Sequence, residues 1–405
     1  MTTFDSNGFP HQSYSKSASV DQFQIINRGN LVTPSSDSFS LGMSKVGKTL
    51  RNSGVSRIIL VHGTMAGTDA LGWYSHWHRV IPGISTKLKS VYKSVVDRLV
   101  GDKGNFTAEY ASVLETALNQ PHTGDSGTAT EVEARIKVEQ FHWTSENHHL
   151  GRADAAVRLV QRLLEVESER VLLIGHSHAA NVFALTTNLM ANSPERNKRF
   201  FEAARYFNAS TGRIDVPTWR SIETELARKY SKRDPGKPLI KNELYKPTFA
   251  TLGGPIRYGW NPDGFDKLLH FVNHRVVESA EDRQAEFRAF VPQTTSEWLA
   301  ALKGEYGDFV QQCFIAQTDF PPAIWSWSAW KANGMLRDLL EGQESDNSRI
   351  WRFQQGKRVA DFGLTLLIDY SKADNSATDA AGHSIYTELD SMEFQMKEIS
   401  QRCFQ

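Results

Sequence analysis

An apolar run, residues 171–174 of an expected strand 170–174, leads directly into Gly175-His176-Ser177-His178-Ala179. A helical pattern, about residues 178–190, follows without a spacer. A serine at such a sharp strand-to-helix turn has a strained backbone, and its hydroxyl points out of the fold. Strand and helix nearly collide there, so small residues are needed two positions before and after it, and Gly175 and Ala179 meet that need. The segment therefore predicts a strand–turn–helix unit with Ser177 at its turn.

Short apolar runs and helical patterns alternate along much of the chain. Alternation of this kind is typical of an α/β fold, with a mostly parallel sheet that has helices on both faces. The expected strands are 22–27, the stretch after Gly29, 57–61, 135–143, 170–174, 248–252, 268–273 and 364–369, and the expected helices are 83–101, 151–166, 178–190 and a terminal helix after about 387.

Two long stretches interrupt the alternation and divide the chain. Residues 191–246 and 275–362 are expected to be largely helical insertions that form a cap. The core would then consist of residues 55–190, 247–274 and 363–405, preceded by an N-terminal arm and early strands in residues 1–54.

Composition narrows the classes of partner. Lys plus Arg and Asp plus Glu both number 46, a balance that gives no electrostatic reason to expect nucleic acid. No apolar run approaches the roughly 20 residues of a membrane span, and the N-terminus lacks the pattern of a secretory signal. We therefore expect a cytoplasmic protein, or one exported without a cleavable signal peptide.

A second motif, Val61-His62-Gly63-Thr64, ends the expected strand 57–61. Acyl transfer needs hydrogen-bond donors aimed at the developing oxyanion, and backbone N–H groups serve this purpose. The N–H groups of Thr64 and of His178, which follows Ser177, are the predicted oxyanion hole. His176 and His178 have no evident third ligand nearby, so the sequence predicts no metal site there.

These two motifs, together with Thr251-Leu252-Gly253-Gly254, resemble the α/β-hydrolase superfamily and, within it, bacterial lipases and esterases. The resemblance covers roughly residues 55–395, interrupted by the two insertions. It implies a Ser–acid–His triad in that chain order, no cofactor, and hydrolysis through an acyl-enzyme.

The resemblance also implies where the base and the acid lie. The histidine is expected after the last strand and before the last helix, which is the position of His383. The acid is expected after the penultimate strand, and Asp308 in Gly307-Asp308-Phe309-Val310 is favoured. Asp374, which would share a short loop with His383, and then Asp369, at the tip of a strand, are the alternatives.

The expected function is therefore cleavage of small-molecule or lipid carboxylic esters, as in a lipase or esterase. The same site would serve an amidase, thioesterase, phospholipase or acyltransferase, and a non-catalytic binding protein of this fold is a further alternative. A tryptophan-rich segment, residues 321–330 with Trp298 upstream, could line an acyl pocket or contact lipid as a lid. Packing within the cap is favoured for most of these tryptophans, and membrane contact is expected only through this segment.

Overall fold

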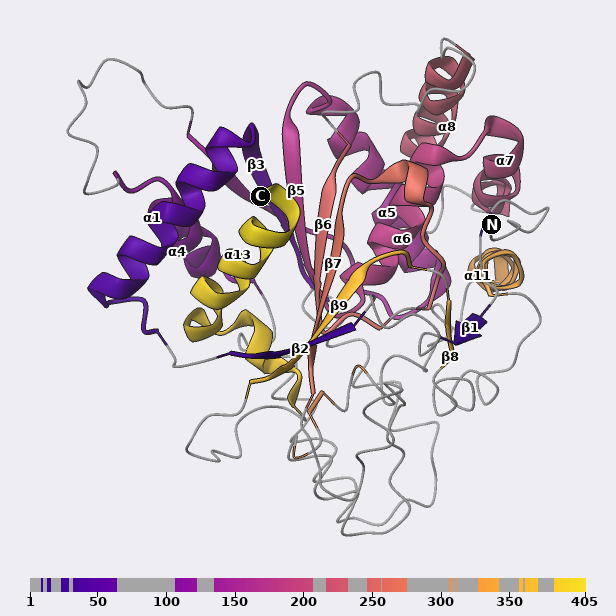
Figure 1. The fold of residues 1–405 in the computed structure, drawn as a ribbon. Helices are drawn as coiled ribbons and strands as arrows, with labels where there is room; N and C mark the ends of the chain where they lie inside the picture. The colour runs from indigo at the N-terminus through magenta and orange to yellow at the C-terminus, as the bar shows by residue number, and fades with distance from the viewer. Residues whose placement is uncertain are drawn as a thin grey trace.

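The computed structural model describes residues 9, 13–15, 23–28, 32–63, 106–121, 135–206, 216–231, 246–255, 257–274, 305, 307–308, 311, 327–341, 357–359, 361–370 and 382–405. Figure 1 shows a central twisted sheet with helices packed on both sides of it.

The central sheet has seven strands in the order β2-β9-β7-β6-β5-β3-β4, and every neighbouring pair is parallel. A separate antiparallel pair joins β1 (Ser13–Ser15) to β8 (Lys357–Val359). The α/β class predicted from the sequence is thus confirmed. The strands are β2 (Phe23–Asn27), β3 (Val55–Val61), β4 (Lys137–Phe141), β5 (Arg170–His176), β6 (Thr248–Leu252), β7 (Leu268–Asn273) and β9 (Leu364–Asp369).

Two apolar cores lie on opposite faces of the sheet. One packs α1 (Asp37–Asn52), α4 (Ala108–Leu118) and α13 (Leu389–Phe404) against the strands. The other contains α5 (His149–Glu165), α6 (Ala179–Ala191), α7 (Pro194–Glu202), α8 (Val216–Ser231) and α11 (Trp327–Leu340). The two groups of helices are well separated in Figure 1. Because both faces are covered, β3, β5, β6 and β7 are almost wholly buried, which explains why their sequences are mostly apolar.

The expectation of a strand after Gly29 is wrong for the described residues 32–52, most of which form α1. The hydroxyl of Ser36 accepts a hydrogen bond from the Phe39 N–H at 3.2 Å and caps the start of this helix. Phe39, Met43, Val46 and Leu50 then form its buried stripe, at the three- and four-residue spacing of a helix. The expected helix 83–101 lies outside the described residues.

The described parts of the two insertions are mainly helical. The first contains α7, the 3-10 turn η4 (Ala203–Tyr206) and α8, and the second contains α11 and β8. In the tryptophan-rich segment, Trp327 is 84% exposed and Trp330 is 44% exposed, so the favoured packing is not found for these two. Trp298 and Trp325 lie outside the described residues.

In the sheet, β4, the next described strand after β3, lies on one side of the β3–β5 pair, and β6, the next described strand after β5, lies on the other. The next described helix after β3 is α4, which packs on one face of the sheet, whereas α6, which follows β5, packs on the other. Ligands of open parallel sheets bind at such a switch point, outside the carboxyl ends of the strands. Gly63 and Ser177 are the residues that lie at these two ends.

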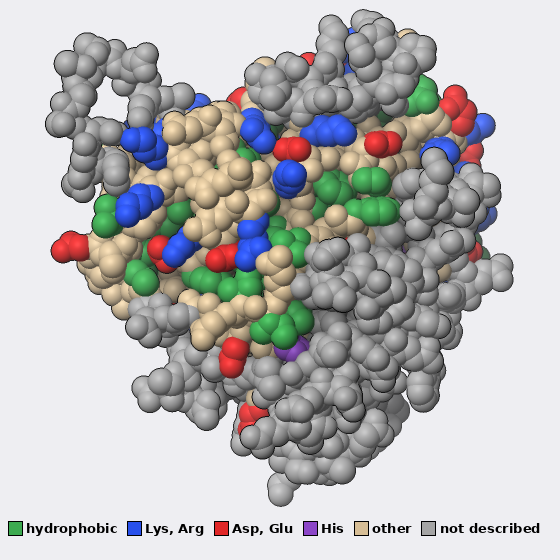
Figure 2. Space-filling view, viewed as in Figure 1, with side chains coloured by type: hydrophobic (Ala, Val, Ile, Leu, Met, Phe, Trp, Pro, Cys, Tyr) green, Lys and Arg blue, Asp and Glu red, His purple; other side chains and the backbone are tan. Residues whose placement is uncertain are grey.

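The described surface carries both signs of charge. On the face shown in Figure 2, Lys and Arg side chains are interspersed with Asp and Glu side chains. Within the described part of the chain, no helix is long and apolar enough to cross a bilayer.

Candidate active site

Ser177 lies at a tight turn between β5 and α6. Its φ is +55°, a left-handed conformation that is uncommon for any residue other than glycine. The Ser177 N–H donates to the Leu252 carbonyl of β6 at 2.9 Å, which helps to hold the turn in place. A Cβ at Gly175 would lie 2.8 Å from the Ala179 Cβ. The strand and helix therefore approach so closely that the positions two before and two after Ser177 must be small.

The end of β3 lies directly against Ser177. Val61 of β3 pairs with Gly175 of β5, and the chains continue side by side to Gly63 and Ser177. A Cβ at Gly63 would be 2.6 Å from the Ser177 Cβ and 3.3 Å from its Oγ, so only glycine fits. Thr64, the first predicted oxyanion donor, lies outside the described residues. His178, the second, follows Ser177 immediately and occupies the residue position just before α6.

His62 holds the chain just before Gly63. Its Nε2 accepts a hydrogen bond from the Trp143 N–H at 3.3 Å, so the proton resides on Nδ1, which is 3.0 Å from the Gly63 carbonyl and from Ser145 Oγ. Trp143 Nε1 also donates to the His62 carbonyl at 2.9 Å. Burial lowers the pKa of His62 to about 4, against a smaller opposing effect of the Gly63 hydrogen bond. His62 is thus a neutral, fixed support for this loop.

The structure brings Asp308 and His383 together. His383 Nδ1 donates to Asp308 Oδ2 at 2.8 Å, and both side chains are almost completely buried. Of the other two acid candidates, Asp369 is exposed at the end of β9, and its charge acts on His274. Asp374 lies outside the described residues.

The hydrogen bond to Asp308 leaves His383 Nε2 as the free acceptor of the ring. This nitrogen is buried and makes no hydrogen bond to any residue that the structure describes, Ser177 included. The ring lies beside the turn that carries Ser177, because the His176 ring is 4.5 Å from it between centroids and His176 Nε2 donates to the His383 carbonyl at 3.1 Å. In such an arrangement, His383 is suited to accept a proton at Nε2.

Asn273, at the end of β7, was not anticipated from the sequence. Its carbonyl accepts from the Asp308 N–H at 2.8 Å, and its Nδ2 donates to the Gly382 carbonyl at 2.9 Å. Its own N–H donates to the Tyr386 hydroxyl at 2.6 Å. One buried asparagine therefore ties the loop that carries Asp308 to the loop that carries His383. The one sequence signal for it was an amide residue at the end of a buried strand.

A second buried network begins at His178. Asn181 Nδ2 lies 3.1 Å from His178 Nδ1, and Asn181 Oδ1 accepts from the Arg257 N–H at 3.0 Å. The Arg257 guanidinium in turn pairs with Glu341 at 2.8 Å, with both side chains buried. This pair joins the end of α11 to the segment after β6, which Asn181 in turn holds to the start of α6, and it was also not anticipated from the sequence.

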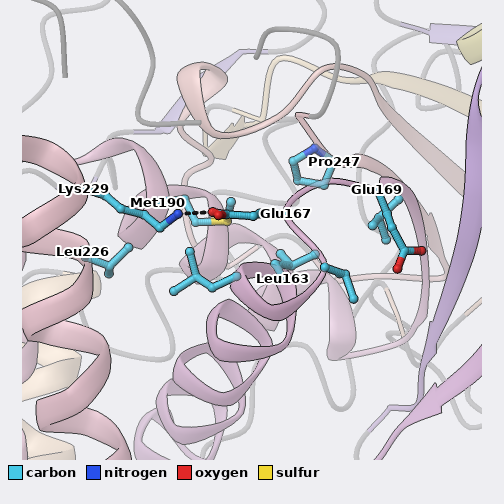
Figure 3. A pocket seen from close by; sticks show the side chains of 10 residues that line it. Leu163, Glu167, Glu169, Met190, Leu226, Lys229 and Pro247 are labelled. Atoms are coloured by element: carbon cyan, nitrogen blue, oxygen red, sulfur yellow. Dashed lines mark hydrogen bonds and ion pairs between the residues drawn. The ribbon is translucent and has the colours of Figure 1, made fainter. Parts of the chain in front are cut away.

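Two surface hollows lie away from Ser177. One, of about 30 Å³, is lined by Leu163, Met190, Leu226 and Pro247 and lies beside the ion pair of Lys229 with Glu167 (Figure 3). This is the end of the molecule where the strands begin, and so little space holds only a water or two. The other, of about 270 Å³, lies between α7 and α8. Neither includes Ser177, Asp308 or His383 among its lining residues. Among the described residues, no group of three His, Cys, Asp or Glu side chains could hold a metal ion.

Comparison with known proteins gives no relative. No protein-family model matches the chain, and neither a curated protein nor a solved structure matches it. Function is therefore inferred from the geometry and chemistry of the site.

Proposed function

We propose that the protein is a serine hydrolase of the α/β-hydrolase type that cleaves carboxylic esters through an acyl-enzyme on Ser177. The observation that carries the proposal is the buried Asp308–His383 pair, 2.8 Å between Nδ1 and Oδ2, beside the strained turn of Ser177. A base oriented by a carboxylate next to a serine at a strand-to-helix turn is the arrangement that activates a hydroxyl nucleophile.

The topology supports the same assignment. Ser177 follows β5, Asp308 lies where the chain returns to the end of β7, and His383 follows β9. The chain order serine, acid, histidine is that of α/β-hydrolases and differs from the orders found in chymotrypsin and subtilisin.

In the proposed reaction, Ser177 Oγ attacks the ester carbonyl while His383 Nε2 accepts its proton. Asp308 stabilises the positive charge that forms on the imidazole. The N–H of His178, with that of Thr64, donates to the oxyanion. His383 then returns the proton to the leaving alcohol, and water hydrolyses the acyl-enzyme to release the acid.

The polar environment of the turn suits this chemistry. Ser177 is only 4% exposed and His178 is fully buried. Donors at the N-terminus of α6 add a partial positive charge where the oxyanion would form. In a site from which water is largely excluded, such dipoles act more strongly than they would in bulk solvent.

Replacement of Ser177 tests the proposal. Ser177→Ala is expected to abolish hydrolysis of short p-nitrophenyl esters, with a fall of at least about 10⁴-fold in kcat, and to abolish labelling by a fluorophosphonate probe. Ser400→Ala, which removes a buried hydroxyl on α13 that bonds the Lys397 carbonyl, is the matched control and should retain both. Circular dichroism checks that both variants are folded.

Two outcomes would contradict the proposal. Labelling of Ser177→Ala at the wild-type rate would place the nucleophile elsewhere. Failure of the wild-type protein to react with either the esters or the probe would favour a binding protein without catalysis. A parallel panel of amide, thioester and phospholipid substrates distinguishes the ester reaction from the other acyl transfers.

A further inference from the structure

Tyr386 contacts the same carboxylate oxygen as His383. It lies in the 3-10 turn η11 (Ser384–Thr387), one turn beyond His383, and is completely buried. Its hydroxyl donates to Asp308 Oδ2 at 3.0 Å, the atom to which His383 Nδ1 donates at 2.8 Å. The other oxygen, Oδ1, accepts from the Gln311 N–H at 2.8 Å. Two side chains therefore share one oxygen of the acid.

A second hydrogen bond to the Tyr386 oxygen indicates where the hydroxyl proton points. The Asn273 N–H donates to the Tyr386 oxygen at 2.6 Å, so the hydroxyl proton is free to point toward Asp308. Burial and, next, the negative charge of Asp308 raise the pKa of Tyr386 well above its usual value. The phenol is therefore neutral, and a donor, at any pH at which the protein would be assayed.

The loop after β6 makes room for this contact. Gly253 has a φ of +58°, and a Cβ there would lie 2.6 Å from Asp308 Oδ2 and would also collide with the Tyr386 ring. Any other residue at this position would push the phenol and the carboxylate apart. Gly253 is part of the Gly253-Gly254 pair singled out in the sequence, and its requirement comes from the acid and its tyrosine.

We propose that Tyr386 is a positioning residue that holds the Asp308 carboxylate and withdraws part of the negative charge that Asp308 presents to His383. This inference rests on the proposed function, because it assigns a role to the pair that would serve Ser177. A hydrogen bond to a charged group is stronger than one between neutral groups. Sharing of one oxygen therefore weakens the pull of Asp308 on an imidazolium, and the base becomes free at lower pH.

Other titratable groups also surround this cluster. The His176 ring of β5 packs on His383, and the Tyr370 ring beyond β9 packs on Tyr386 with centroids 5.4 Å apart. Arg28 lies over the Tyr370 ring, and His274 bridges to Gly307 beside the acid. Of these groups, only Tyr386 donates directly to the oxygen that His383 uses, so among them its removal alone changes the hydrogen bonds of that oxygen directly.

Tyr386→Phe removes this hydrogen bond, together with the one that the Tyr386 oxygen accepts from the Asn273 N–H. The rate constant for fluorophosphonate labelling and kcat/KM for a p-nitrophenyl ester are measured from acid to neutral pH. We expect the midpoint of the acid limb to move upward by about 0.5–1 pH unit, the equivalent of one hydrogen bond. The rate on the limb then falls about 3- to 10-fold, while the plateau changes much less. A purely structural role would lower the rate equally at every pH.

Tyr370→Phe is the matched control, since it removes a fully buried phenol oxygen that neighbours Tyr386 and does not contact Asp308. An unmoved limb in Tyr386→Phe, or an equal movement in Tyr370→Phe, would overturn the inference. Should Tyr386→Phe not fold, 3-fluorotyrosine installed at position 386 provides a stronger donor. The acid limb of the pH profile must then move to lower pH. An unmoved limb would again overturn the inference about Tyr386.

A measurement in a Ser177→Ala background distinguishes this inference from the proposed function. The hydrogen-bonded Nδ1–H proton of His383 is followed by NMR as the pH is lowered, with Tyr386 or Phe at position 386. The midpoint of the change should move upward on loss of the phenol, by the amount seen in the kinetics. Movement of the midpoint, together with a wild-type protein that never reacts with the probe, would keep the role of Tyr386 and reject the hydrolase. No movement would reject the role of Tyr386 alone.

Discussion

The Asp308→Asn variant gives the sharpest test of which carboxylate orients His383. In the structure, Asp308 Oδ2 accepts from His383 and Tyr386, and Oδ1 accepts from the Gln311 N–H. An asparagine has one acceptor oxygen, and its NH2 group only donates, so it cannot satisfy donors on both sides of the side chain. The substitution keeps the volume of the side chain and removes its charge.

The orientation of the new amide sets the magnitude. When the asparagine oxygen faces His383 and Tyr386, its NH2 group opposes another donor only at the Gln311 N–H. His383 then keeps its tautomer. The reverse orientation opposes two donors, so the first is favoured. The main loss is then the attraction between the carboxylate and the imidazolium. For two unit charges about 4 Å apart at an effective dielectric constant of 20, this attraction is about 4 kcal/mol. The equivalent change in kcat is about 10³-fold.

The assay compares the three aspartates that the sequence left open. The variants Asp308→Asn, Asp369→Asn and Asp374→Asn are measured for kcat/KM with a p-nitrophenyl ester and for the rate of labelling by a fluorophosphonate. We expect the loss of about 10³-fold in Asp308→Asn only. Asp369→Asn serves as the matched control, because that side chain is exposed at the end of β9.

Retention of activity within about tenfold of wild type in Asp308→Asn would refute this account of the pair, since about 1.4 kcal/mol is too little for a charge at this distance. A loss in Asp374→Asn that exceeds the loss in Asp308→Asn would transfer the role to that residue. Urea unfolding of each variant separates a loss of chemistry from a loss of structure.

Two further predictions concern stability. The pKa of His62, lowered by burial from 6.5 to about 4, gives stability that is fully present above pH 6.5 and is lost as the pH falls through 4, because the unfolded chain binds the proton first. The loss is about 3 kcal/mol in the free energy of unfolding. In urea unfolding measured across this pH range, His62→Gln should lack this part of the pH dependence of stability. Equal pH dependence in the wild-type and variant proteins would contradict this prediction. Glu341→Gln leaves the buried Arg257 charge without its carboxylate and should lower the free energy of unfolding by about 3–5 kcal/mol. Glu165→Gln, at a half-exposed ion pair, should lower it by less than about 1 kcal/mol. Equal unfolding free energies of the two variants would contradict the burial argument.

Local patterns predicted the framework well. The strands Thr248–Leu252, Leu268–Asn273 and Leu364–Asp369 have the bounds expected from their apolar runs. Burial on both faces makes such strands almost uniformly apolar, and a signal of that kind is readable without tertiary information. The turn of Ser177 was equally readable, since its small residues at 175 and 179 answer a local collision between strand and helix.

Two kinds of feature were not read from the sequence: one helix with a weak local pattern, and contacts between residues far apart in the chain. The helix α1 was missed, although Ser36 caps it, because serine, glycine and lysine residues separate its four apolar anchors and a polar stretch precedes it. The choice of Asp308 over its rivals came from family order, and only the fold shows its contact with His383. Asn273 and Tyr386 act through partners far away in the sequence, and a single residue of this kind leaves no periodic signal.

The closure of the second insertion explains how the acid can lie so far along the chain from its strand. The chain leaves the sheet at His274 and returns at Gly307, where the two residues form an antiparallel bridge. The Asp308 N–H then bonds the Asn273 carbonyl, so in space the acid follows β7 almost directly. The entropic cost of bringing the ends of a loop together grows only slowly with its length, so a long insertion between these two ends is tolerated. The bridge and Asn273 therefore help to fix the position of Asp308 beside β7.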